Sequence, residues 1–508
     1  MRYDYSKLQN GSDIRGVAMD IFENEPVNLT EEAASRLARG FLYLLTVKTG
    51  KAANEITVSV GRDSRLTGPA LENAITDALA TYGASVIDCG LSSTPAMFMS
   101  TVFPEFNCDG AIMITASHLP KNRNGMKFFD ADGGLDKADI SDIINFAESD
   151  SILNRLFPAS EKSIIEKDLI KAYSAHLRDL IIRGVDPNSD KPLAGLSITV
   201  DAGNGAGGFY AENVLKPLGA DVSSSQFLEP DGNFPNHAPN PENKEAIASI
   251  CGAVKKSATH LGIIFDTDVD RASAVDEHGC EINRDAIVAL AAALIADDFP
   301  GTTVVTDSIT GTGLTEFLES DLGLKHLRFK RGYKNVINKA SALCESGTDS
   351  QLAIETSGHA AYKENYFLDD GAYLATKIVI RAAKLFREGK GISSLIENLK
   401  KPQESREVRF PITAEDFGPC GDKIIEELSS FVESGNLENA HLETPNYEGV
   451  RVTFTSPEID GWMLLRKSLH DPIMPLNMES SCKGGCDKIA ELIKPFLSQF
   501  KDLDTSKL

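Results

Sequence analysis

Short apolar runs rich in β-branched residues recur along the first 400 residues, and each is followed by a polar turn and then a helical pattern. This alternation predicts strands of mostly parallel sheets that are connected by helices. In open sheets of this kind ligands bind beyond the carboxyl ends of the strands, so we expect the chemistry in the polar turns. The runs with the most informative turns are 56–60, 111–115, 196–200, 261–265, 303–305 and 351–354.

The pattern changes after residue 400. Residues 450–455 and 462–465 are typical of strands, with a polar turn between them and helical segments on either side, which indicates a smaller α+β domain. We therefore predict an α/β protein of four domains, in which three related mixed α/β domains precede that smaller one. The predicted domains are 1–155, 156–272, 273–400 and 401–508.

Composition limits the possible partners. The 508 residues contain 51 Lys and Arg against 74 Asp and Glu, a formal net charge of −23. Nucleic-acid binders normally present a basic face, and so acidic a surface also repels anionic membranes. No apolar run approaches the ~18 residues of a membrane span. We expect neither nucleic acid nor a membrane as partner, and an anionic ligand would have to bind at a local cluster of cations.

The cysteines and the C-terminus bear on location. The eight cysteines are scattered along the chain, which is more typical of a reducing compartment than of a disulfide scaffold. Ser506-Lys507-Leu508 matches the peroxisomal address that an import receptor reads. We predict a peroxisomal or glycosome-like location through that receptor, or a cytoplasmic one if the signal is not used. A monomer and a homodimer are both open.

The turn 266–271, D-T-D-V-D-R, places Asp266, Asp268 and Asp270 at alternate positions directly after an apolar run. Alternation in an extended loop turns these side chains to the same side, where their repulsion is costly without a cation. Carboxylates without His or Cys favour Mg²⁺ over zinc or copper. The turn therefore predicts a magnesium site.

A second turn, 115–120, places a hydroxyl beside an imidazole in Ser117-His118 and is followed by Lys121, Arg123 and Lys127. No G-x-S-x-G motif surrounds the serine, which disfavours acyl transfer. A serine that carries a phosphoryl group fits better, because a phosphoserine dianion needs nearby cations and Mg²⁺. Lys127 is a candidate general acid or base.

Two further turns offer groups for sugar and phosphate. The turn 355–359, E-T-S-G-H, combines a carboxylate, two hydroxyls and an imidazole, which suit sugar hydroxyls. The turn 466–472, R-K-S-L-H-D-P, offers two cations and a hydroxyl after an apolar run, and is a candidate phosphate site.

Together and in this order, the four turns resemble motifs of the α-D-phosphohexomutase family, which includes phosphoglucomutase and phosphomannomutase. The resemblance covers the family's T-A-S-H-N-P, D-G-D-G-D-R, G-E-x-S-G-H and R-x-S-G/N-T-x-P loops. Residues 11–16, 61–65 and 330–334 are similar to further family segments. Leu469 and His470 stand where the family has Gly or Asn and then Thr.

The resemblance implies a role for each turn. Ser117 would be the phosphoserine, and Asp266, Asp268 and Asp270 would hold Mg²⁺ with it. His118 and Lys127 would assist proton transfer, and Arg15, Arg62 and Arg271 would line the site. The implied substrate-binding residues are Lys330, Gly332, Tyr333, Glu355, Ser357, His359, Arg466, Ser468 and His470.

The family reaction would exchange the 1- and 6-phosphates of a hexose, glucose or mannose, through a hexose 1,6-bisphosphate that also activates the enzyme. Two related alternatives are a hexose 1,6-bisphosphate synthase and a phosphosugar-binding protein without turnover. A third, a dinucleotide-dependent oxidoreductase, rests on the glycine-rich turn 203–208, which lacks a full G-x-G-x-x-G spacing. The alternative for that turn is a tight connection that permits close packing.

Overall fold

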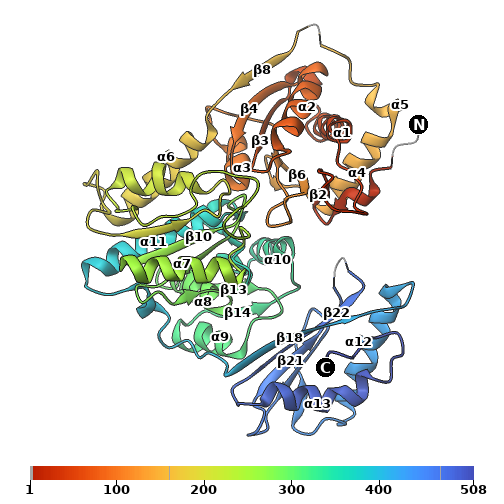
Figure 1. Ribbon diagram of the computed structural model, residues 1–508, viewed down its shortest axis with the longest axis vertical. Helices are drawn as coiled ribbons and strands as arrows, with labels where there is room; N and C mark the ends of the chain where they lie inside the picture. The colour runs from red at the N-terminus through yellow and green to blue at the C-terminus, as the bar shows by residue number, and fades with distance from the viewer. Residues whose placement is uncertain (1–3, 160, 469–470) are drawn as a thin grey trace. The chain divides into compact units, whose positions relative to one another are not determined.

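The computed structural model describes residues 4–159, 161–468 and 471–508, which form two compact units (Figure 1). The first unit comprises Met1–Asn283 and Ser357–Leu395, and the second Arg284–Thr356 and Ile396–Leu508. The chain therefore enters the second unit, returns to the first and leaves it again. Among the described residues, no helix combines the length and the apolar character needed to cross a bilayer.

An eight-stranded sheet lies at the N-terminal end of the first unit, in the order β1-β2-β6-β5-β3-β4-β8, with β7 against β6. β3 is parallel to β4 and β5, and β4 to β8, whereas β6 is antiparallel to β5 and β2. The strands are β1 (Gln9–Asn10), β2 (Asp13–Val17), β3 (Thr57–Arg62), β4 (Ser85–Leu91), β5 (Gly110–Ile114), β6 (Arg123–Asp130), β7 (Gly133–Gly134) and β8 (Ser163–Glu166).

Helices pack on this sheet through their apolar faces. They are α1 (Glu31–Thr49), α2 (Gly68–Thr81), α3 (Thr94–Val102), α4 (Lys137–Glu148) and α5 (Asp150–Leu153). In α1, Leu37 and Phe41 are fully buried in one cluster with Val58, Val60 and Ile112 of the sheet. The Thr30 side chain caps α1 by accepting from Ala33 N–H, and Gly50 ends the helix in the left-handed conformation.

The second sheet of this unit has the order β12-β11-β10-β9. Its strands are β9 (Ile198–Asp201), β10 (Leu261–Phe265), β11 (Ala272–Val275) and β12 (Glu281–Ile282), with the hairpin strands β16 (Ala360–Tyr362) and β17 (Leu368–Asp369) in the same unit. The helices are α6 (Leu169–Val185), α7 (Lys244–Ser257) and α11 (Gly371–Arg387). The predicted boundary at 272 is wrong, because β11 pairs antiparallel with β10 and continues its sheet.

The second unit contains a parallel group, in which β13 pairs with both β14 and β15, and an antiparallel sheet of order β18-β22-β21-β20-β19. The first group comprises α8 (Asp285–Ala293), β13 (Thr303–Thr306), α9 (Thr312–Glu316), β14 (Lys325–Arg328), α10 (Tyr333–Glu345) and β15 (Leu352–Ile354). The antiparallel part comprises β18 (Glu404–Pro411), α12 (Phe417–Glu433), β19 (Ala440–Leu442), β20 (Val450–Phe454), β21 (Gly461–Leu465), β22 (Ile473–Ser480) and α13 (Gly485–Leu497).

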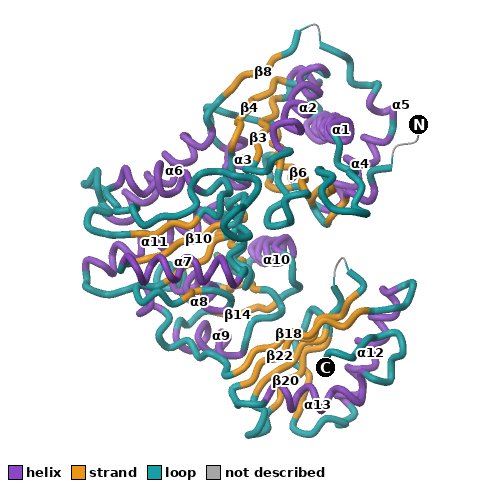
Figure 2. Tube along the Cα trace, viewed as in Figure 1, coloured by secondary structure: helices purple, strands orange, loops and turns teal. Residues whose placement is uncertain are grey.

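Alternation of apolar and polar residues explains the antiparallel sheet, which is covered by α12 and α13 (Figure 2). Ile424 and Leu428 of α12, with Ile489 and Ile493 of α13, are fully buried in its core. Short 3-10 or π segments complete the described chain: Ser6–Leu8, Ala53–Glu55, Tyr210–Leu215, Lys216–Leu218, Phe317–Asp321, Lys363–Asn365 and Ile392–Leu395.

The strands predicted from apolar runs are confirmed. The runs 56–60, 111–115, 196–200, 261–265, 303–305 and 351–354 correspond to β3, β5, β9, β10, β13 and β15, and the two late runs to β20 and β21. The first-unit sheets are more mixed than predicted, because the chain after each of β5 and β10 returns as an antiparallel neighbour.

Candidate active site

The serine turn follows β5 and holds Ser117 in a left-handed conformation with φ of 48°. Such a φ is costly for a residue with a side chain, so surrounding contacts must hold it. Ser117 N–H donates to Thr115 Oγ1 at 2.9 Å, and Ser117 Oγ donates to Asp266 Oδ2 at 3.0 Å. The serine is 5% exposed. Because its hydroxyl bonds to Asp266, it points at the predicted metal loop.

The metal loop follows β10, and its three aspartates converge. Asp266, Asp268 and Asp270 are fully buried, and one carboxylate oxygen of each lies within 4.8 Å of the others. Thr94 at the start of α3 holds Asp268, because its Oγ1 donates to Asp268 Oδ2 at 2.6 Å and its N–H to the Asp268 carbonyl at 2.8 Å. The structure thus brings together the three residues that the sequence pattern singled out.

The donor set and its electrostatics fit a divalent cation. Burial and the neighbouring Asp270 and Asp268 carboxylates raise the pKa of Asp266 well above its usual range. Burial alone would also raise the pKa of Asp270, but Lys127, His359 and Arg271 lower it below its usual range. Asp268 Oδ1 and Asp270 Oδ1 are buried without a hydrogen-bond partner among the described residues. A hard cation would satisfy these oxygens and relieve the repulsion.

Two of the predicted cations reach this centre directly. Lys127 on β6 is 5% exposed, hydrogen-bonds Asp270 and lies 3.4 Å from Asp268 Oδ2. Arg271 is 2% exposed, and its Nη2 lies 3.1 Å from Asp266 Oδ2 and 3.3 Å from Ser117 Oγ. Both cations therefore offset the buried carboxylates.

The other two predicted arginines are engaged nearby. Arg15 on β2 pairs with Asp13 at 2.8 Å, and its charge acts on His118. Arg62 at the end of β3 pairs with Glu72 at 2.7 Å and donates to the Asp63 carbonyl at 3.3 Å. Their part in substrate binding stays a prediction.

The pKa of His118 lies below its usual value, because its surroundings, and then the Arg271 and Arg15 cations, disfavour the charged ring. The neutral imidazole is therefore the favoured form. His118 Nδ1 lies 2.7 Å from Arg271 Nη2, which must donate because a guanidinium has no acceptor. The proton of the neutral ring is therefore on Nε2.

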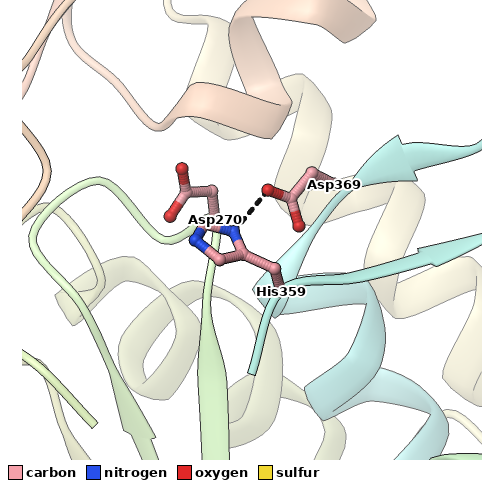
Figure 3. A group of neighbouring side chains, drawn as sticks. All are labelled: Asp270, His359 and Asp369. Atoms are coloured by element: carbon pink, nitrogen blue, oxygen red, sulfur yellow. Dashed lines mark hydrogen bonds and ion pairs between the residues drawn. The ribbon is translucent and has the colours of Figure 1, made fainter. Parts of the chain in front are cut away.

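His359 lies beside the metal loop, between Asp270 and Asp369 (Figure 3). Its Nδ1 is 2.5 Å from Asp369 Oδ2, and the imidazole side chain is 15% exposed. Burial alone would lower the pKa of His359, but Asp369 and Asp270 raise it above the usual value. The sequence pattern grouped His359 with sugar-binding residues, whereas the structure places it close to the Ser117 centre.

Arg65 and Asp63 support the serine turn, and the sequence pattern missed both. The Arg65 guanidinium, 1% exposed, donates to the carbonyl oxygens of Ser117 and Leu119 at 2.5 and 2.6 Å, and to those of Pro120 and Arg123 at 2.9 Å each. Asp63 Oδ2 accepts from Thr115 Oγ1 at 2.7 Å. Nothing in the sequence of segment 61–65 shows which carbonyl oxygens its second arginine, Arg65, binds.

The glycine-rich turn 203–208 packs against protein. A Cβ at Gly205 would lie 2.6 Å from the Thr267 carbonyl oxygen, and one at Gly208 would lie 2.2 Å from the Leu228 carbonyl oxygen. Ala206 N–H donates to the Thr267 carbonyl at 2.8 Å. These glycines bring backbone against the metal loop, so the turn supports the aspartates and the dinucleotide hypothesis loses its basis.

The second unit contains the remaining predicted groups, apart from Ser357 and His359. Glu355 is 4% exposed, and its Oε1 accepts from Gly332 N–H at 2.6 Å. Glu448 Oε2 accepts from Arg331 N–H at 3.1 Å and also from the Ser308 hydroxyl. Lys330 is exposed and Tyr333 half-buried. Ser357, the next residue but one after Glu355, belongs to the first unit and has a buried hydroxyl.

Arg466 and Ser468 follow β21 in the same unit. Arg466 is 7% exposed and donates to the Lys467 carbonyl at 3.4 Å, and its Nε is buried without a hydrogen-bond partner among the described residues. Burial lowers the pKa of Arg466 below its usual value, Glu448 raises it and Arg331 lowers it. The Glu448 and Arg331 charges therefore both act on Arg466. His470 lies outside the described residues.

The sequence comparisons agree with this architecture. Family models described as phosphoglucomutase/phosphomannomutase, alpha/beta/alpha domains I, II and III match residues 6–151, 171–279 and 283–402. A phosphoglucomutase of Neisseria gonorrhoeae is 30% identical over 491 residues, 95% of each chain. A phosphoglucomutase/phosphomannomutase of Thermococcus kodakarensis is 30% identical over 498 residues, 96% of this chain and 97% of its own.

A solved structure extends the likeness to the fold. A phosphoglucomutase/phosphomannomutase family protein of Burkholderia thailandensis superposes with a TM-score of 0.75 at 25% identity, covering 97% of both chains. The fold and site thus define a phosphohexomutase architecture of three α/β/α domains and a further domain. The chain belongs to the phosphoglucomutase/phosphomannomutase family, a family of intramolecular phosphotransferases.

Proposed function

We propose that this chain interconverts hexose 1-phosphates and hexose 6-phosphates, with glucose, mannose or both as the sugar. One observation carries the proposal: the Ser117 hydroxyl is buried 3.0 Å from Asp266 and 3.3 Å from Arg271, beside two further buried carboxylates. A hydroxyl so placed is suited to carry a phosphoryl group rather than to attack a carbonyl. The relatives are named as mutases, and none of those cited supports the synthase or the non-catalytic alternative.

Asp266, Asp268 and Asp270 are the residues that would hold Mg²⁺. When bound, the ion would supply positive charge to the transferring phosphoryl group. Arg271 and Lys127 would also stabilise the negative charge of the transferring phosphoryl group, because both cations lie against these aspartates. The family resemblance and the buried acidic group support this assignment together.

In the proposed reaction, the free hydroxyl of a sugar monophosphate attacks phosphorus on phosphorylated Ser117. The bond from phosphorus to Ser117 Oγ breaks as the bond to the sugar oxygen forms, which gives a hexose 1,6-bisphosphate. Arg271 Nη2 is placed to stabilise the departing Oγ. The bisphosphate reorients and returns its other phosphoryl group to Ser117, so the phosphate changes position while the enzyme is restored.

The attacking hydroxyl must lose a proton, and the oxygen released in the second half must gain one. Lys127 and His359 are the groups that we assign to this exchange, since both border Asp270. Asp369 fixes the orientation of the His359 ring through Nδ1. His118, predicted for proton transfer, accepts from Arg271 at Nδ1 and is assigned to positioning that arginine.

The second unit would hold the sugar and the phosphate that is not being transferred. Glu355 offers its carboxylate to sugar hydroxyls, and the loop with Lys330, Gly332 and Tyr333 contacts it through Gly332 N–H. Arg466 and Ser468, with Arg331 nearby, would bind the phosphate. Ser357 keeps its predicted role in sugar binding, and His470 its predicted role as a hydrogen-bond donor to the phosphate.

A substrate panel tests the proposal. Glucose 1-phosphate and mannose 1-phosphate are supplied with Mg²⁺, with and without a trace of the matching hexose 1,6-bisphosphate. We expect 6-phosphate product, stimulation by bisphosphate, and an intact mass that shows one phosphoryl group on Ser117. Product that requires an external phosphoryl donor would indicate a synthase, and binding without Ser117 phosphorylation would indicate a non-catalytic protein.

The peroxisomal address at Ser506-Lys507-Leu508 remains our proposal for location. Lys494 Nζ donates to the Leu508 carbonyl at 2.7 Å, and Leu508 packs against the core of the antiparallel sheet. An import receptor would have to displace both contacts. Deletion of these three residues from a fluorescent fusion should move it from peroxisomes to the cytoplasm, and unchanged peroxisomal location would contradict the proposal.

A further inference from the structure

β8 is an open edge of the eight-stranded sheet. It pairs in parallel with β4, and no described strand pairs with its other side (Figure 1). All four of its residues are exposed, including Ile164 at 42% and Ile165 at 51%. Phe157, in the segment that leads to β8, is 80% exposed. Unprotected edges carrying apolar side chains tend to pair with another strand.

The direction of the free backbone groups follows from the pairing with β4. Glu166 lies opposite Asp88, and Lys167 N–H donates to the Asp88 carbonyl at 3.0 Å. Alternate residues of a parallel strand bond to the same neighbour, so Ser163, Ile165 and Lys167 direct their backbone groups to β4. Ile164 and Glu166 direct theirs outward, where no described residue accepts or donates.

The strand sequence E-K-S-I-I-E-K, residues 161–167, is complementary to itself in one antiparallel register. In a two-fold pair, residues with outward backbone groups must lie opposite one another. A two-fold axis at Ile164 places Lys162 opposite Glu166 of the second copy, and Glu161 opposite its Lys167. Every charge then meets its opposite, and Ile164 packs on its own copy.

The neighbouring registers lack this match. An axis at Ser163 places Lys162 opposite Ile164 of the second copy, and an axis at Ile165 places Ile164 opposite its Glu166. Each brings a charge against an apolar side chain. The charged residues of this edge discourage its pairing with unrelated strands. They permit pairing with a second copy in the register centred on Ile164.

We propose that two copies of this chain associate through β8, in the register centred on Ile164, so that two eight-stranded sheets become continuous. The occupant of the edge is a second copy because the charge pattern is complementary to itself. Lys162 also contacts Asp77 of its own chain, and Lys167 Nζ donates to the Glu105 carbonyl at 2.6 Å. These contacts hold both cations beside the strand before association.

The test uses two charge reversals of the full-length protein. We expect the wild type to sediment as a dimer, and Lys162→Glu and Glu166→Lys each to weaken dimerisation at least ~10-fold, because each creates two like-charged pairs across the axis. An equimolar mixture of the two variants should dimerise again. In the mixed pair, the acid introduced at position 162 faces the base introduced at position 166, and the two native side chains face each other.

Lys256→Glu is the matched control, since it makes the same charge change at an exposed position of α7 and should leave the dimer intact. Thermal melting and mutase turnover of each variant show that the fold is retained. The proposal is overturned by a wild type that stays monomeric over the accessible concentration range. Dimers that persist in both variants, or a mixture that stays monomeric, overturn it equally.

Discussion

The two units hold their charged groups differently. In the first, Asp266, Asp268 and Asp270 are fully buried, and Lys127, Arg271 and Thr94 each contact at least one of them. In the second, Glu355 and Arg466 are also buried, but the loops with Lys330, Tyr333 and Ser468 are half-buried or exposed. In the proposed mechanism, the first arrangement fixes the atoms between which a bond forms, whereas the second leaves side chains able to adjust to two orientations of a substrate.

Burial explains why this division is useful. Three carboxylates in a dry site cost folding free energy unless cations offset them, but there they act on the reacting phosphoryl group with little screening by water. The phosphate that is bound but not transferred needs less precise positioning than the reacting phosphoryl group. Water-accessible cations bind and release it more readily. The comparison predicts that changes in the first unit lower kcat and that changes in the second raise KM.

The largest effect is expected at the serine itself. Ser117→Ala removes the phosphoryl carrier, so turnover should fall by several orders of magnitude and the phosphorylated mass should disappear. Ser468→Ala is the matched change in the second unit and should retain the phosphorylated mass. Turnover of Ser117→Ala at the wild-type rate would remove this residue from the mechanism.

The metal loop should give the next largest effect. Asp268→Asn keeps the size of the side chain but removes one carboxylate charge, and kcat should fall at least ~100-fold. Mg²⁺ should raise the melting temperature of the wild type, and this rise should be smaller in the variant, which tests binding without turnover. Thr94→Val removes only the bond that orients Asp268 and should have a milder effect. An unchanged response to Mg²⁺ in Asp268→Asn would contradict the site.

Arg65→Lys tests whether the serine turn needs its four-carbonyl support. A lysine cannot reproduce the planar fork, so Ser117 should lose its fixed φ and kcat should fall by ~10- to 100-fold at nearly constant KM. Arg387→Lys, at an exposed pair with Asp186, is the control and should be near wild type. An increase in KM alone would show that Arg65 acts on binding instead.

Arg466→Lys probes the second unit. The variant keeps a positive charge but loses the paired donors for a phosphate, and KM for the sugar phosphate should rise by ~10-fold with a smaller change in kcat. Lys423→Arg, on the exposed surface of α12, is a control. A decrease in kcat without an increase in KM would contradict the assignment of chemistry to the first unit and phosphate binding to the second.

The sequence alone predicts the parts of the site that are local. Asp266, Asp268 and Asp270 lie within five residues of one another, and Ser117 and His118 are adjacent, so a short turn is enough to bring each group together. The support from Arg65 is 52 residues from Ser117, and the approach of His359 to the metal loop depends on a backbone bridge to Arg271 that forms only in the folded unit. A local sequence pattern cannot predict contacts between residues so far apart in the chain.

The domain division shows the same limit. Alternating strands and helices predict the elements well, because hydrophobic periodicity is a local signal. The return of Ser357–Leu395 to the first unit depends on which surfaces pack, and the chain crosses between units inside the predicted sugar turn, from Thr356 to Ser357. The pattern of apolar runs and turns does not predict where the chain passes from one unit to the other.

The smallest expected effect concerns Glu479, a half-buried acid of the second unit that has no metal loop around it. A Cβ on Gly311 would lie 2.6 Å from Glu479 Oε2 and 2.8 Å from Asp285 Oδ2, so these two carboxyl groups are neighbours. Burial, and then the Asp285 charge, raise the pKa of Glu479 from 4.5 to about 7. The folded state therefore binds this proton more tightly than the unfolded chain does.

Stability from this proton is fully present below pH 4.5 and is lost as the pH rises through about 7, so the second unit should melt a few degrees lower at pH 8 than at pH 6. The single tryptophan, Trp462, reports it, because its Nε1 donates to Glu479 at 3.0 Å. Glu479→Gln should flatten the pH dependence of its fluorescence, whereas Glu458→Gln at the exposed pair with Lys488 should not. An unaltered titration in Glu479→Gln would assign the proton to another group.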